Sequence, residues 1–512
     1  MKKYSIIFLM SVFVFGGCQD ILDEEPETFL SEDQVFDSED GVETAVNGIY
    51  NSFSSPEYHG SAFHGLIMPH SGKFYSNQGA SEDATSLNCT PINIWLTRLW
   101  PGTFETINVA NVTIDQLENS TVPLANRDFA LGQAYFLRAA TYFDLVRWFG
   151  GVPLRLTPAD SKTLHLPRSS RDEVYTQIIM DFQRAKELMP DFGEYRPERP
   201  VKWAAYMYLA KVYMTMATMN GNNDLQLWQK AYDEAIQVYG KYSLEPLYAD
   251  VFDLNNENNG ESIFEIQYGQ NGAIRNSDVI RTYTPQNSLF APENQVTFGR
   301  VKANKETFDS HQDQYPGDPR LDATYIYGSY ERTDGTTRTV YPERTNGNDG
   351  FAYIKKYIDP NYNGTTTNRN FIKLRYADLL LMLAEIENEL NGPANAYQYV
   401  NEVLARARNT ENGPAAQPAD YAGMTQDQFR ERIMMERQYE LLAEGHTWFD
   451  VRRRGYEYFL QHVIYPHNES PNFHQSTDFV YPVTVKNMLL PIPSDEISGN
   501  YEITQADQNP GY

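Results

Sequence analysis

The stretch LRYADLLLMLAEIENEL, residues 374–390, decides the fold and lies within a longer helical segment at 373–454. Apolar side chains recur in it every three or four residues, as on one face of an α-helix, at Leu379, Leu383, Ile386 and Leu390. A second face carries smaller residues, at Ala377, Leu380 and Ala384. A helix that is apolar on two faces packs between neighbouring elements. The sequence therefore predicts a central helix over about 375–391.

Two more helices follow the central one along the chain. Gly-Pro at 392–393 ends the first helix, because glycine accepts a left-handed helix end and proline cannot continue a helix. The second helix is predicted at 394–408 and the third at 426–444, where Thr425 and Gln428 have the spacing of a capping box. A helical hairpin with a packing partner is the unit from which α-solenoids are stacked.

The rest of the chain alternates helical runs with long loops. The helical scaffold is predicted at about 38–53, 103–240 and 371–460. Ala231 and Ala235, one turn apart, resemble the second helix of a tetratricopeptide repeat, where small residues let two helices approach closely. ESIFEIQY at 261–268 alternates like a strand. Residues 54–100 and 269–370 are predicted to be loop-rich, and loops on a rigid frame are the usual place for a ligand site.

Several runs resemble the SusD/RagB family. They are QAYFLRAATYFDLVRWFGGVPL at 133–154, the central run at 374–390, NEVLARAR at 401–408, ERQYELLAEGHTWFDVRRRG at 436–455, LLPIPSDEISGN at 489–500 and QADQNPGY at 505–512. The resemblance implies a mainly α fold in which tetratricopeptide-like helix pairs form a right-handed superhelical scaffold. It also implies an irregular, loop-rich binding half with a few short strands.

The resemblance further implies a non-catalytic protein of the cell surface. Members of the family are lipid-anchored proteins of the outer membrane that face outward and cap a SusC-like TonB-dependent transporter. They deliver oligosaccharides, and in some members peptides or other nutrients, to that transporter. We therefore expect an oligosaccharide ligand, a transporter partner and a membrane contact through a lipid anchor.

The N-terminus has the features of a lipoprotein signal peptide over residues 1–17. Lys2 and Lys3 precede an apolar run at 6–15, which is too short to span a bilayer. Phe15-Gly16-Gly17-Cys18 resembles a lipobox, which predicts lipidation of Cys18 and a SusD-like domain over 18–512. The alternative is ordinary cleavage near Gly17, which would leave a free thiol.

The composition argues against several classes of function. The net charge of −26 is unsuited to nucleic acid, because phosphate contacts need a basic surface. Two cysteines cannot build a disulfide framework. The sequence holds no nucleophile motif, phosphate loop or nucleotide fingerprint, so no catalytic residue is predicted.

Two groups of residues carry side chains of the kinds that bind metals. His59, His64 and His70 lie five and six residues apart, which is not a zinc spacing, so we interpret them as surface or loop histidines. NNENNG at 255–260 could hold a structural calcium but lacks the carboxylate spacing of an EF-hand, and we interpret it as a turn. No metal ligand is predicted.

Aromatic and polar residues of the two loop regions are the candidate ligand-binding residues. An aromatic ring can cover the apolar C–H face of a sugar while amides, carboxylates and arginines bond its hydroxyls. The candidates are Trp95, Tyr75, Asn77, Asp83, Tyr283 and Phe298, with Trp95 first among them. The alternative for each aromatic is that it anchors its loop to the scaffold, since large aromatics are mostly buried.

Three functions stay open on the sequence. The first is glycan binding, which depends on a stacking aromatic. The second is capture of a peptide or another nutrient, which would use backbone hydrogen bonds along a groove. The third is a surface glycoside hydrolase, which would need two carboxylates across a cleft, and the sequence shows no pair with that signature.

Overall fold

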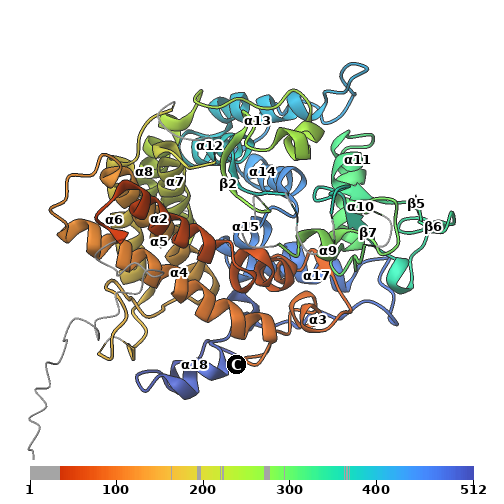
Figure 1. Ribbon diagram of the computed structural model, residues 1–512. Helices are drawn as coiled ribbons and strands as arrows, with labels where there is room; N and C mark the ends of the chain where they lie inside the picture. The colour runs from red at the N-terminus through yellow and green to blue at the C-terminus, as the bar shows by residue number, and fades with distance from the viewer. Residues whose placement is uncertain are drawn as a thin grey trace, which may run out of the picture.

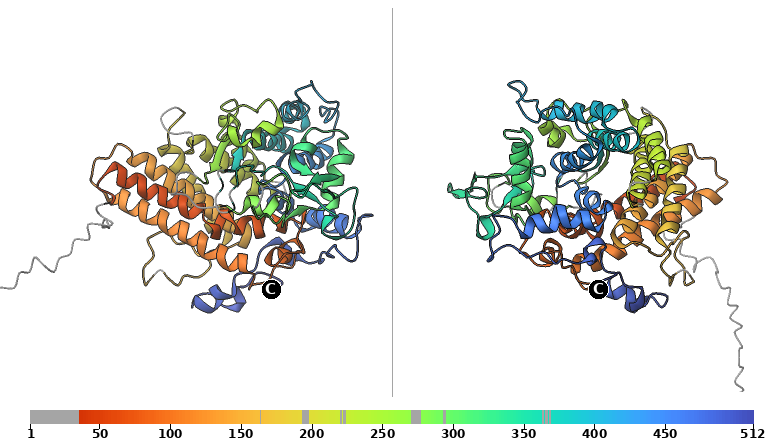
Figure 2. Two further views of the ribbon diagram at one scale, coloured as in Figure 1. Left: turned by 45° about the vertical axis from the view of Figure 1, so that its right-hand side comes forward. Right: turned by 180° about the vertical axis from the view of Figure 1, so that it is seen from behind.

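A computed structural model describes residues 35–512, apart from 163, 193–197, 220, 222–223, 270–276, 293–294, 363, 365–366 and 368. The predicted signal peptide at 1–17 and the lipidation site Cys18 lie outside the described residues. The chain is mainly helical, with a helical half and a loop-rich half on opposite flanks and α12–α14 between them (Figures 1 and 2). No described helix is both long enough and apolar enough to cross a membrane.

Long helices that pack in consecutive pairs build the scaffold. They are α2 (Glu39–Phe53), α4 (Ile94–Asn119), α5 (Arg127–Phe149), α6 (Arg171–Leu188), α7 (Lys202–Met219), α8 (Leu225–Val238), α12 (Tyr376–Asn391), α13 (Pro393–Ala407) and α14 (Gln426–Leu441). The tightest pairs are α5 with α6, α7 with α8 and α12 with α13. This arrangement confirms the predicted tetratricopeptide-like pairing. In the second helix of one pair, Ala231 and Ala235 are both buried.

The central helix α12 is buried along nearly its whole length, as its two apolar faces predict. It contacts α8, α13 and α14, and every residue from Tyr376 to Glu389 is buried. Gly392 ends it with a φ of +81°, a conformation that glycine adopts without strain. At α14 the Thr425 hydroxyl accepts a hydrogen bond from Gln428 N (3.2 Å) and the Gln428 side chain bonds Thr425 N (2.9 Å). The predicted capping box is therefore confirmed.

Short helices and strands make up the loop-rich half. The strands β1 (Phe74–Tyr75), β3 (Lys302–Ala303), β7 (Ala352–Ile354) and β4 (Tyr325–Ile326) form one antiparallel sheet in that order. Two further pairs are β2 (Ser262–Ile266) with β8 (Phe371–Arg375), and β5 (Ser329–Glu331) with β6 (Thr337–Thr339). Strand β2 confirms the strand predicted at 261–268, although its residues from Ile263 to Ile266 are all buried and so do not alternate in exposure.

The remaining α-helices are short. They are α3 (Ala80–Thr85), α9 (Val279–Tyr283), α10 (Lys305–Gln314), α11 (Arg320–Thr324), α15 (Thr447–Arg453), α16 (Tyr456–Phe459), α17 (Tyr465–Asn468) and α18 (Ser494–Gly499). Two single π-helical turns, at Pro56–Gly60 and Phe63–Ile67, lie in the segment where periodicity is lost.

Helix α4 begins nine residues before the predicted start at 103. Pro101-Gly102 resembles a helix break, because proline lacks the N–H that a helix interior uses. The helix continues through it because Leu96, Leu99 and Trp100 are buried on one side. Packing of the apolar face thus outweighs the local breaker signal.

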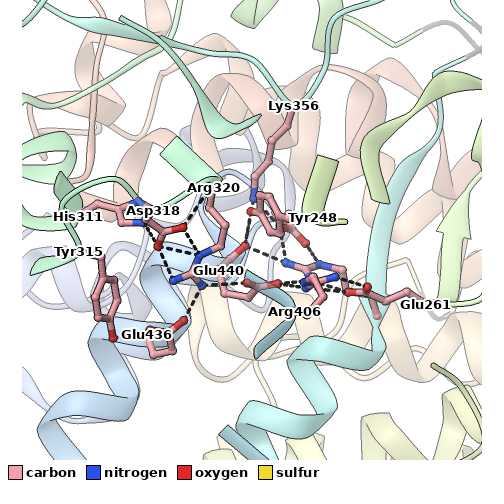
Figure 3. Close-up of polar contacts among 12 residues, drawn as sticks. Tyr248, Glu261, His311, Tyr315, Asp318, Arg320, Lys356, Arg406, Glu436 and Glu440 are labelled. Carbon is pink, nitrogen blue, oxygen red and sulfur yellow. Dashed lines mark hydrogen bonds and ion pairs between the residues drawn. The ribbon is translucent and has the colours of Figure 1, made fainter. Parts of the chain in front are cut away.

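A buried row of ion pairs joins the loop-rich half to the helices (Figure 3). The Arg320 side chain on α11 has no exposed surface and donates to Asp318 (2.8 Å), Glu436 (2.5 Å) and Glu440 (2.9 Å). Burial alone would lower the pKa of the Arg320 guanidinium, but the three carboxylates outweigh it and hold that pKa well above its usual value.

The same row continues into the N-terminal end of α12. Arg375 donates to Glu261 (2.7 Å), Glu440 (2.7 Å) and Glu444 (2.6 Å). Arg406 on α13 donates to Glu261 and Glu440, each at 2.5 Å. Glu440 therefore accepts from three arginines that come from α11, β8 and α13. Despite its burial, these cations hold the pKa of Glu440 well below its usual range.

We expect Arg320→Met to destabilise the fold by about 3–5 kcal/mol, because it leaves the buried carboxylates of Glu436 and Glu440 short of a partner. Urea unfolding followed by circular dichroism measures the change. Arg332→Met is the matched control, since Arg332 pairs with Asp334 at the surface and such a pair is worth less than about 1 kcal/mol. Equal losses for both variants would contradict the role given to Arg320.

Candidate functional site

Trp95 lies in the first turn of α4, and its position is set by the cap of that helix. The Asn93 side chain accepts hydrogen bonds from Trp95 N (2.9 Å) and Leu96 N (3.4 Å). Asn93 Nδ2 in turn donates to the Asp83 carboxylate at 3.1 Å. The predicted ligand-binding residue Asp83 therefore fixes the cap that holds Trp95.

The indole of Trp95 lies against the backbone of Gly65. A Cβ atom at position 65 would be 2.6 Å from Trp95 Cε2, so only glycine permits this approach. Trp95 is partly exposed, whereas the other five tryptophans of the chain are buried. The π-helical turn that contains Gly65 thus supports one side of a ring that solvent still reaches.

Phe298 comes from the second loop region and lies near Trp95. Phe298 N donates to Arg281 O (3.0 Å) and Val301 N donates to Thr282 O (3.0 Å), which ties residues 298–301 to α9. The Arg300 guanidinium lies 5.1 Å from the Phe298 ring centre and 6.0 Å from that of Trp95. One arginine therefore lies near two aromatic rings whose residues are 203 positions apart in the chain.

Two more arginines complete the group. Arg98, one turn after Trp95, lies 5.8 Å from the Trp95 ring centre, and Arg281 lies 4.9 Å from that of Phe298. We call Trp95, Phe298, Arg98, Arg281 and Arg300 the arginine–aromatic platform. Guanidinium groups at these distances make cation–π contacts and also present planar donors to a ligand.

The platform is anchored to the first loop region through the backbone. Asp278 N donates to Gly60 O at 2.6 Å, and Ser277 Oγ donates to the same oxygen at 3.2 Å. The Asp278 carboxylate lies 3.7 Å from Arg281 and 3.9 Å from Arg300. Two loops that are distant in sequence are thereby held together beside Trp95.

The structure corrects the expectation that Tyr75 and Tyr283 stack on a ligand. Tyr75 is 4% exposed and its ring lies flat on Phe351, with centres 3.7 Å apart. Tyr283 is 0% exposed and packs against Tyr357 and His64. Both rings belong to the core, which is the alternative of a loop anchor, and we leave them out of the site.

Asn77 is exposed, but it lies apart from the platform. Its side chain donates to Asn348 Oδ1 at 2.5 Å, which links the end of β1 to the turn before β7. Among the described residues, Asn77 has no ring contact or hydrogen bond with the platform. Of the six predicted residues, the structure brings together Trp95 and Phe298, with Asp83 as a support.

The sequence reading missed the three arginines. Arg98 would have followed from a helix start predicted before Trp95, because residues three apart share one side of a helix. Arg281 and Arg300 carry no local signal. Only the pairing of α9 with residues 298–301 places them beside each other.

The three histidines of the first loop region are core residues, which corrects their interpretation as surface or loop histidines. His59, His64 and His70 are each 0% exposed. Burial lowers the pKa of His59 to about 4 and that of His64 and His70 to about 3, so all three are neutral at pH 7. Within the described ranges, no cluster of three or more His, Cys, Asp or Glu side chains is placed to hold a metal ion.

The 255–260 segment forms a turn, as interpreted. Asn258 N donates to Glu265 Oε1 (2.9 Å) and Gly260 N donates to Glu245 Oε1 (3.1 Å). These carboxylates bond the backbone of the turn, and Asn258 adopts a φ of +55°, which asparagine tolerates.

Comparisons with known proteins agree with this architecture. The sequence model described as "SusD family" matches residues 203–512, and the one described as "Starch-binding associating with outer membrane" matches residues 20–214. SusD-like protein P2 of Formosa agariphila is 30% identical over 539 residues, which cover 100% of both chains.

Solved structures show the same fold. A SusD homolog from Bacteroides thetaiotaomicron is 21% identical, with a TM-score of 0.76 over 94% of this chain and 98% of that one. A laminarin-binding SusD-like protein is 20% identical, with a TM-score of 0.70 over 93% of this chain and 100% of that one. The family resemblance of the sequence is thus confirmed, and the chain belongs to the SusD family.

Proposed function

We propose that this protein binds an oligosaccharide on the arginine–aromatic platform without cleaving it. The observation that carries the proposal is that Trp95 and Phe298, from two segments distant in the sequence, both lie within cation–π distance of Arg300. Family membership supports it, as does a structural neighbour described as laminarin-binding. The matched family models are described as SusD and starch-binding, and neither description names an enzyme.

The platform has the properties that sugar recognition needs. The partly exposed Trp95 ring offers an apolar face to the C–H groups of a pyranose, and the arginines offer donors to its oxygens. The indole lies against Gly65, and the backbone N–H of Trp95 is held by the Asn93 cap. A ligand therefore loses little affinity to ordering of the site.

We further propose where the protein acts. Residues 1–17 are removed as a leader, Cys18 is lipidated, and residues 18–512 face outward on the outer membrane. A family description that includes outer-membrane association supports this placement. The bound oligosaccharide is then handed to a SusC-like TonB-dependent transporter, as the family resemblance implies.

Trp95→Ala should weaken binding of a glycan ligand by roughly 1–3 kcal/mol, about 5- to 150-fold in Kd, because it removes the central stacking surface. Isothermal titration against a glycan panel measures the change. Tyr501→Ala is the control. The Tyr501 ring is also exposed (82%), but it stacks on His165, which is not part of the platform. Binding of peptides alone, unaffected by Trp95→Ala, would overturn the glycan assignment in favour of peptide capture.

Gly65→Ala should also weaken glycan binding, because the added methyl group would push the Trp95 indole out of place. We expect a loss approaching that of Trp95→Ala, together with a change in acrylamide quenching of tryptophan fluorescence. Gly48→Ala in α2 is the matched control, since its Cβ would meet Val109 at an ordinary 3.7 Å. Unchanged affinity in Gly65→Ala would mean that the position of Trp95 does not matter for binding.

Cys18→Ala should abolish incorporation of labelled palmitate and release the protein from the membrane fraction. Cys89→Ala is the control, because Cys89 is buried in the folded domain and cannot be acylated there. Metabolic labelling in a host that processes lipoproteins measures both variants. Undiminished label in Cys18→Ala would refute the proposed anchor.

A further inference from the structure

The platform carries an excess of positive charge. Arg98, Arg281 and Arg300 stand around the two rings, and Asp278 is the carboxylate that the structure places beside them. The Asp278 carboxylate oxygens lie 3.7 Å from the Arg281 guanidinium and 3.9 Å from that of Arg300, which is longer than a charge-assisted hydrogen bond. Among the described residues, Arg98 has no ion pair with a carboxylate. Among the described residues, the three arginines thus share one carboxylate, that of Asp278.

This excess stands out against the rest of the protein. The chain has a net charge of −26, and its fully buried arginines Arg320 and Arg375 are each matched by three carboxylates. In an acidic chain, carboxylates outnumber basic side chains, so every arginine could have a carboxylate partner. At the platform the described residues include a single carboxylate, Asp278, so part of the positive charge there is not neutralised.

The arginine donors at the platform are also partly withdrawn from water. The Arg300 side chain is 19% exposed, and Arg281 Nε is buried without a hydrogen-bond partner among the described residues. A buried donor without a partner costs about 1–3 kcal/mol. Burial lowers the pKa of Arg300, Asp278 opposes that shift, and the neighbouring cation Arg281 adds to it. An anion bound between Arg281 and Arg300 would relieve both the repulsion and the unpaired donor.

We infer that the oligosaccharide bound at this platform carries an anionic substituent, a uronate carboxylate or a sulfate ester, which Arg300 binds with help from Arg98 and Arg281. The inference rests on the proposed glycan-binding function and narrows its ligand class. The planar fork of a guanidinium matches both kinds of oxyanion with two parallel hydrogen bonds. The flanking rings of Trp95 and Phe298 would cover the sugar that carries the charge.

A neutral sugar fits the same place less well. Its hydroxyls could accept from the arginines, but they would leave the excess positive charge uncompensated while burying it further, which opposes binding. The platform should therefore prefer the charged member of any pair of glycans that share one backbone.

The test pairs anionic glycans with neutral counterparts of the same backbone. One arm compares oligogalacturonides with their methyl esters, and the other compares sulfated galactan oligosaccharides with their desulfated forms. Titration of the full protein should show roughly tenfold or tighter binding of the anionic member in one arm, which identifies carboxylate or sulfate as the charge. That affinity should fall as NaCl rises from 50 to 500 mM, because salt screens the contact.

Arg300→Gln should weaken binding of the anionic glycan by roughly tenfold or more. It should change the affinity for the neutral glycan by less than about threefold. Arg184→Gln is the matched control, since Arg184 pairs with Glu187 on α6 in the helical half and should bind as the unmodified protein does. Binding confined to the neutral members, or equal losses for both members in Arg300→Gln, overturns the inference and leaves the proposed function standing. Binding of no glycan in either arm overturns both.

Discussion

The structure depends on one buried carboxylate, Glu440, that three arginines share. Arg320, Arg375 and Arg406 reach it from α11, β8 and α13. Withdrawing such charges from water costs several kcal/mol per ion, and their attraction offsets this only when every partner is in place. The row of ion pairs therefore acts less as a source of net stability than as a requirement that these segments meet in one arrangement.

That requirement matters for the site because the loop-rich half has little regular structure of its own. Its strands are two to five residues long, and its helices α9 and α11 have five residues each. Helix α11 is held to α14 by Arg320, and α9 is held to the first loop region through Gly60. Phe298 and Arg300 then come to lie beside Trp95, so the platform is the product of contacts between segments rather than of any one loop.

The charge of the platform is opposite in sign to that of the chain. A net charge of −26 sets the long-range field, but a ligand within a few ångströms meets the nearest groups first, since the Debye length in physiological salt is about 8 Å. The composition rightly weighs against nucleic acid, which needs an extended basic surface. It does not weigh against a small anionic group that three arginines surround.

The sequence by itself determined the helical scaffold, the central helix, the capping box of α14, the strand at 261–268 and the family. These follow from periodicity and short-range motifs, which the chain carries locally. It also singled out Trp95 and, after it, Phe298, but it put Tyr75 and Tyr283 in the same list, because the sequence alone cannot tell an aromatic ring that supports a loop from one that faces a ligand. Only the tertiary structure separated them: Phe351 covers Tyr75, Tyr357 and His64 cover Tyr283, and Trp95 keeps a face that solvent reaches. Exposure of a ring depends on which distant segment packs against it, and no local pattern of residues records that.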